Sequence, residues 1–95
     1  MHKATYRLET QINTAFRLAP GSRDAHYELG RIHLERGEWH QAAEEGEKAF
    51  AAAGIGTTDR QIHFLLTRAY ARVGKTVLAA RHLALFNASG ASLRR

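Results

Sequence analysis

The chain has 95 residues, one proline, no cysteine and a formal net charge of +5 at pH 7. This length fits one small domain with a single core, and the missing cysteines exclude disulfides and thiolate metal sites. No stretch approaches the roughly 20 apolar residues of a membrane helix, and no signal peptide is seen at the N-terminus, so a soluble and by default cytoplasmic protein is expected.

The first half of the chain predicts three helices, because its apolar residues recur every three or four positions. A lone helix is expected over about residues 3–18, before the breaking sequence at 19–21. A second runs over residues 23–36 and stops at Gly37. Its antiparallel partner is expected over residues 39–53.

The second half repeats this layout with a helix over about residues 59–73, a stop at Gly74 and a last helix over residues 76–87. Asp24, Thr58 and Thr76 are suited to capping or to the first turn of these helices. About five helices and an all-α fold are therefore expected.

The two halves match at an offset of 37. The identical pairs at this offset include His26/His63, Leu29/Leu66, Arg31/Arg68, Gly37/Gly74, Ala42/Ala79 and Ala43/Ala80. A fixed period is typical of repeat folds. The single domain of residues 1–95 is thus predicted to contain part of a repeat (3–20), two full repeats (23–56 and 60–88) and a flexible tail (89–95).

The spacing resembles that of the tetratricopeptide repeat, a helix–turn–helix unit with the pattern W-x2-L-G-x2-Y, then A-x3-F, then P. The matching positions are His26-x2-Leu29-Gly30-x2-His33-x3-Gly37-x4-Ala42 and His63-x2-Leu66-Thr67-x2-Tyr70-x3-Gly74-x4-Ala79. The resemblance implies helix pairs stacked as a right-handed superhelix. Gly46 stands where the family has a large aromatic residue, which predicts a loose or indented spot.

Gly74-Lys75-Thr76 looks like the end of a phosphate-binding loop. However, Ala69 takes the position of the first glycine, and the preceding residues have the periodicity of a helix instead of a strand. Gly74 also matches Gly37, so a turn between helices is the better interpretation.

Six histidines raise the question of a metal site, since His26, His33 and His63 fall on equivalent or neighbouring helix positions. No His-x3-His motif with an adjacent glutamate is present, and the repeat register already explains these positions as packing residues. No metal, cofactor or catalytic group is expected, and the chain is predicted to be non-catalytic.

The resemblance implies that the first helices of successive repeats line a concave groove that binds a peptide or protein segment. The residues expected there lie opposite the packing face: Asp24, Tyr27, Arg31 and Leu34 in one repeat, and Gln61, Phe64, Arg68 and Arg72 in the next. Each repeat presents an aromatic residue followed one turn later by arginine, which favours an acidic or C-terminal peptide. The alternative is that the aromatics fill gaps between helices and the arginines are solvated.

The basic charge is confined to the C-terminal third, because residues 60–95 hold seven Lys/Arg and no acid. Nucleic acid or another anionic surface is therefore the alternative partner, unless acids of neighbouring helices balance the charge. The terminal helices lack a polar cover, which indicates a piece of a longer protein or a homodimer. The sequence does not name the partner.

Overall fold

The computed structural model describes residues 21–54 and 56–93. These residues form four helices and no strand, which confirms the all-α prediction. The helices are α2 (Arg23–Glu35), α3 (Trp39–Ala51), α4 (Asp59–Val73) and α5 (Thr76–Leu93). The helix predicted over residues 3–20 lies outside the described residues.

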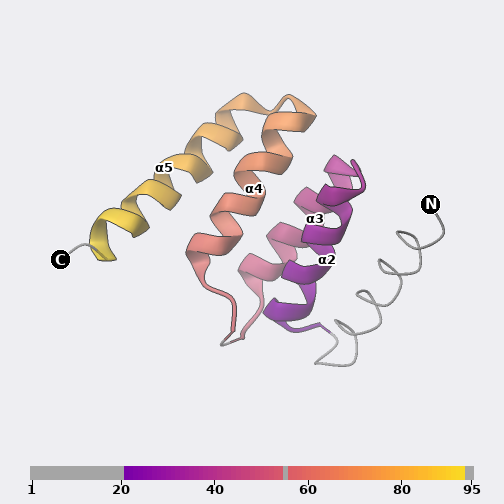
Figure 1. The fold of residues 1–95 in the computed structure, drawn as a ribbon, viewed down its shortest axis with the longest axis horizontal. Coiled ribbons are helices and arrows are strands. Elements are labelled where there is room, and N and C mark those ends of the chain that lie inside the picture. Colours follow the sequence, from indigo (N-terminus) through magenta and orange to yellow (C-terminus); the bar gives the residue numbers. More distant parts are fainter. Residues whose placement is uncertain (1–20, 55, 94–95) are drawn as a thin grey trace.

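The four helices run alternately up and down, and each packs on the next (Figure 1). α2 and α3 make one antiparallel pair, and α4 and α5 make a second pair. α3 packs on α4, and α2 also meets α4. None of the helices in residues 21–54 and 56–93 combines the length and apolarity that a membrane crossing requires.

The two predicted hinges have the same backbone geometry. Gly37 and Gly74 have left-handed φ angles of 76° and 89°, which glycine adopts without steric strain. The Gly37 N–H donates to the Leu34 carbonyl, and the next N–H donates to the His33 carbonyl. Both bonds recur 37 residues later, since Gly74 donates to Ala71 and Lys75 donates to Tyr70. The helix before Gly74 excludes a phosphate-binding loop, which requires a strand there.

We expect Gly37→Ala and Gly74→Ala each to lower the free energy of unfolding by about 1 kcal/mol, because a side chain strains a left-handed backbone. Neither added Cβ would clash, since nothing lies within 4 Å at Gly74 and the nearest atom at Gly37 is 3.7 Å away. The matched controls are the two asparagine variants, which tolerate this conformation better. Urea unfolding checks the prediction, and two alanine variants of clearly different stability would argue against equivalent hinges.

Side-chain caps start the first helix of each pair. The Ser22 hydroxyl accepts from the Ala25 N–H at the start of α2. At the start of α4, Thr58 and Gln61 form a reciprocal capping box, as the predicted role of Thr58 requires. These contacts satisfy backbone N–H groups that have no partner within the helix.

The connection between the pairs is held by the first turn of α2. Arg23 donates to the carbonyls of Phe50, Ala52 and Thr57, and it pairs with Asp59 at 2.7 Å. Next to it, Asp24 accepts a hydrogen bond from the Thr57 hydroxyl. This network ties Ala52 and Thr57, on the two sides of the connection, to the start of α2.

The core lies where α3 and α4 meet. Ile62 and Leu66 of α4 are the largest fully buried side chains. Gly46 of α3 was expected to leave a loose or indented spot, and the structure shows an indentation that Leu66 fills and not a loose spot. A Cβ built at Gly46 would lie 2.6 Å from a methyl group of Leu66, so the leucine already fills the space.

Two helix ends differ from the predicted ones. α3 ends at Ala51 instead of Ala53, and α5 continues to Leu93 instead of ending at Asn87. Gly90 within α5 lowers helix stability by only about 1 kcal/mol relative to alanine. The exposed large apolar side chains of α5 are Val77, Leu83 and Leu85.

Candidate functional site

A hollow of about 380 Å³ lies between α2 and α4, the first helices of the two pairs. We call it the α2–α4 hollow. Its lining comes from α2, from the start of α3 and from one face of α4: Leu34, Glu35, Trp39, Arg68, Ala71 and Arg72. Leu34, Trp39 and Ala71 give it an apolar part, and the two arginines give it positive charge.

The two arginines of the hollow lie against aromatic rings. The Arg72 guanidinium carbon is 5.1 Å from the centre of the Trp39 ring, and that of Arg68 is 5.7 Å from the centre of Phe64. Among the residues that the structure describes, neither arginine is in an ion pair. Stacking on a ring orients a guanidinium and leaves its N–H groups free to donate.

Three of the eight predicted site residues line this hollow: Leu34, Arg68 and Arg72. Leu34 has a second role, because it is only 7% exposed and belongs to the core. Asp24 and Gln61 lie at the starts of their helices, where they bond Thr57 and Thr58. These two side chains therefore stabilise the fold and are not among the residues that line the hollow.

The remaining three predicted residues lie on the same two helices. Tyr27 is half-buried against the core, and burial raises the pKa of its hydroxyl. Arg31 pairs with Glu28 at 3.0 Å, so its charge is locally balanced. Phe64 is 46% exposed and packs on Phe86, with ring centres 5.4 Å apart. The aromatic–arginine pattern thus has different environments in the two repeats.

Comparisons with models of protein families, with curated proteins and with solved structures find no match to this chain.

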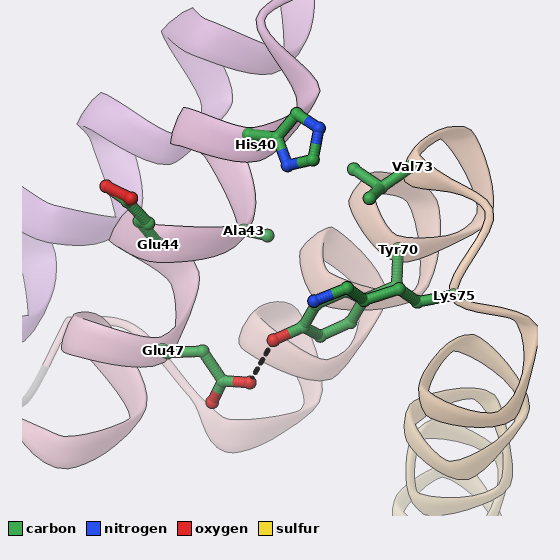
Figure 2. A pocket seen from close by; sticks show the side chains of 7 residues that line it. All are labelled: His40, Ala43, Glu44, Glu47, Tyr70, Val73 and Lys75. Carbon is green, nitrogen blue, oxygen red and sulfur yellow. Dashed lines mark hydrogen bonds between the residues drawn. The ribbon is translucent and has the colours of Figure 1, made fainter.

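A second, smaller hollow of about 210 Å³ lies on the other side of α4, against α3 (Figure 2). Glu47 accepts a hydrogen bond from the Tyr70 hydroxyl there. Figure 2 shows the Glu44 carboxylate directed away from Tyr70, so the two glutamates do not converge. The other charged or titratable residues of its lining are His40, Glu44 and Lys75.

The equivalent histidines have different partners. His26 Nδ1 lies 2.7 Å from a Glu45 carboxylate oxygen, whereas His63 is buried and bonds His82. His33 Nδ1 lies 2.8 Å from Glu38. No group of three or more metal-ligating side chains occurs within the part of the chain that the structure describes.

Trp39, Glu35 and Ala71 line the hollow but were not among the site residues predicted from the sequence. A signal for Trp39 was present, because the only tryptophan of the chain follows the Gly37 turn by two residues. A turn of fixed geometry places such a side chain beside the first helix of the next pair.

Proposed function

We propose that this chain is a non-catalytic protein-interaction module of the tetratricopeptide type, and that an acidic peptide segment binds in the α2–α4 hollow. The repeated hinges at Gly37 and Gly74 support the repeat assignment. The observation that carries the binding proposal is the pair of arginines, Arg68 and Arg72, without an acidic partner among the described residues and beside an apolar depression.

The chemistry of the hollow suits one kind of segment. An aliphatic or aromatic side chain of the peptide can contact Leu34, Trp39 and Ala71. This contact removes water from the apolar surfaces of the peptide and of the hollow. A neighbouring carboxylate then accepts paired hydrogen bonds from a guanidinium of Arg68 or Arg72. Glu35 at the edge repels a segment that is acidic at every position, so a mixed apolar and acidic segment fits best.

A display selection from random peptides tests the proposal. We expect enrichment of acidic residues next to a large apolar residue. The affinity of a selected peptide is then measured from the fluorescence of Trp39, which is the only tryptophan and lines the hollow. Arg68→Gln and Arg72→Gln are each expected to weaken binding by about tenfold, the loss of one charged hydrogen-bond pair.

The matched control is Arg81→Gln, which removes an exposed arginine of α5 that does not line the hollow. Its affinity should stay within about twofold of the wild type. Peptides without acidic enrichment, or an Arg68→Gln, Arg72→Gln double variant with unchanged affinity, would refute the proposal.

The salt dependence of binding distinguishes the alternative function, nucleic-acid binding, from peptide binding. Binding to phosphates releases counterions, so its affinity falls steeply with salt concentration. Tight binding of a single-stranded oligonucleotide, with such a salt dependence and with losses in Arg60→Gln as well as Arg68→Gln, would favour the basic C-terminal third as a nucleic-acid surface.

A further inference from the structure

Two histidines face each other in the interface between α4 and α5. His63 of α4 is 5% exposed, and His82 of α5 is 7% exposed. Their Nδ1 atoms lie 2.9 Å apart, and their ring centres lie 5.1 Å apart. A contact of this length between two nitrogens is a hydrogen bond that joins the two helices.

The groups around this pair come from three helices. From α3, the Phe50 ring lies 5.2 Å from that of His63, and a Glu47 oxygen lies 4.0 Å from His82 Nε2. From α4, Tyr70 stacks on His82 and donates its hydroxyl to Glu47. From α5, Arg81 adds a positive charge near His82. The pair thus has one carboxylate near it, which is already engaged by Tyr70.

Proton counting limits the charge of the pair. A hydrogen bond between two Nδ1 atoms needs one donor and one acceptor, so one ring must lack a proton on its Nδ1. When both rings are protonated, both Nδ1 atoms are donors, and two positive charges face each other in a buried site. The folded interface therefore accepts at most one added proton without losing the bond.

The groups around His82 determine whether the stability of the folded chain rises or falls with pH. Burial lowers the pKa of His82 below its ordinary value of 6.5; Glu47 opposes this change, while His63 and Arg81 add to it. The unfolded chain therefore binds a proton on His82 as the pH falls through about 6.5, while the folded chain does so only at lower pH. Stability is full above about pH 6.5 and decreases from there down to the folded pKa.

We propose that the His63–His82 pair makes the docking of α5 on α4 sensitive to protonation, so that mild acidification loosens α5 while the α2–α3 pair stays folded. The contacts of α5 extend to the binding side of α4. Phe86 packs on Phe64, and the Arg60 guanidinium carbon lies 3.9 Å from the Phe86 ring centre. Loosening of α5 therefore releases Phe64, the ring that orients Arg68. This effect on binding rests on the proposed function, whereas the loosening itself does not.

Hydrogen exchange of backbone amides, corrected for intrinsic rates, tests the loosening at about pH 7.5 and about pH 5. Protection of α5 is expected to fall at the lower pH relative to that of α2, because the pKa of His82 is lowered in the folded chain. In His82→Gln, which cannot be protonated, the difference should disappear. His40→Gln, which removes an exposed histidine of α3, is the control and should behave as the wild type.

The titration of the imidazole of His82 by NMR in the wild-type chain keeps the test valid if His82→Gln folds poorly. The expected midpoint lies below the ordinary value of 6.5. A midpoint at or above that value, or equal protection of α5 at both pH values, would overturn the proposal. Neither readout uses a peptide, so peptide binding can fail while the pH response is observed, and the reverse also holds.

Discussion

Leu66→Ala is expected to lower the free energy of unfolding by about 3 kcal/mol, the typical cost of a cavity at a fully buried leucine. Leu66 is 0% exposed and its methyl group occupies the space above Gly46. Because Gly46 has no side chain, the helix opposite offers nothing that could move into the cavity. Urea unfolding measures the loss, and Leu83→Ala, which removes a leucine 44% exposed on α5, is the control with an expected loss below about 1 kcal/mol.

A double-mutant comparison at Gly46 and Leu66 gives a second test of this packing. Gly46→Ala places a Cβ 2.6 Å from the Leu66 methyl group in the wild-type chain, so its gain in helix propensity is offset by the clash. In the Leu66→Ala background the clash is absent, and Gly46→Ala should stabilise by about 1 kcal/mol. If the effect of Gly46→Ala were the same in both backgrounds, Leu66 would not be the residue that fills this space.

Gly30→Thr is expected to destabilise the chain by about 2 kcal/mol. A Cβ at Gly30 would lie 2.7 Å from a Leu65 methyl group and 3.4 Å from the Ala42 carbonyl oxygen, so there is no room for a branched side chain. Threonine is the residue that the second repeat has at the matching position, Thr67, where its hydroxyl donates to the His63 carbonyl.

The reciprocal variant, Thr67→Gly, should cost less than about 1 kcal/mol, because it changes helix propensity without creating a clash. Unfolding of both variants by denaturant therefore shows whether the two helix pairs pack differently at this position. Equal losses in Gly30→Thr and Thr67→Gly would mean that α2–α3 and α4–α5 pack alike, contrary to the structure.

The features that the sequence predicted correctly depend on interactions between residues only a few positions apart. Gly37 and Gly74 were recognised because a glycine after a helical pattern is the usual residue for a left-handed helix end. Thr58 was recognised as a cap, since a hydroxyl at that position reaches the N–H groups of the first turn. The all-α class followed from apolar residues that recur every three or four positions.

The features that sequence did not predict depend on contacts between distant residues. Arg23 was not expected to hold the connection between pairs, because its partners lie up to 36 residues away. The spot at Gly46 was expected to be loose or indented, and that Leu66 fills it was not predicted, because the orientation of Leu66 cannot be derived from its own neighbours in the sequence. His82 was likewise overlooked, since only the packing of α5 on α4 places it against His63.

A map of NMR chemical-shift changes tests the proposal that an acidic segment binds in the α2–α4 hollow. The isotope-labelled chain is titrated with a peptide from the display selection. We predict that the largest changes fall on the Trp39 indole N–H and on the amides around Leu34, Arg68 and Arg72. Changes concentrated on α5 around Val77, or in the second hollow around Glu44, with these signals unmoved, would contradict the account.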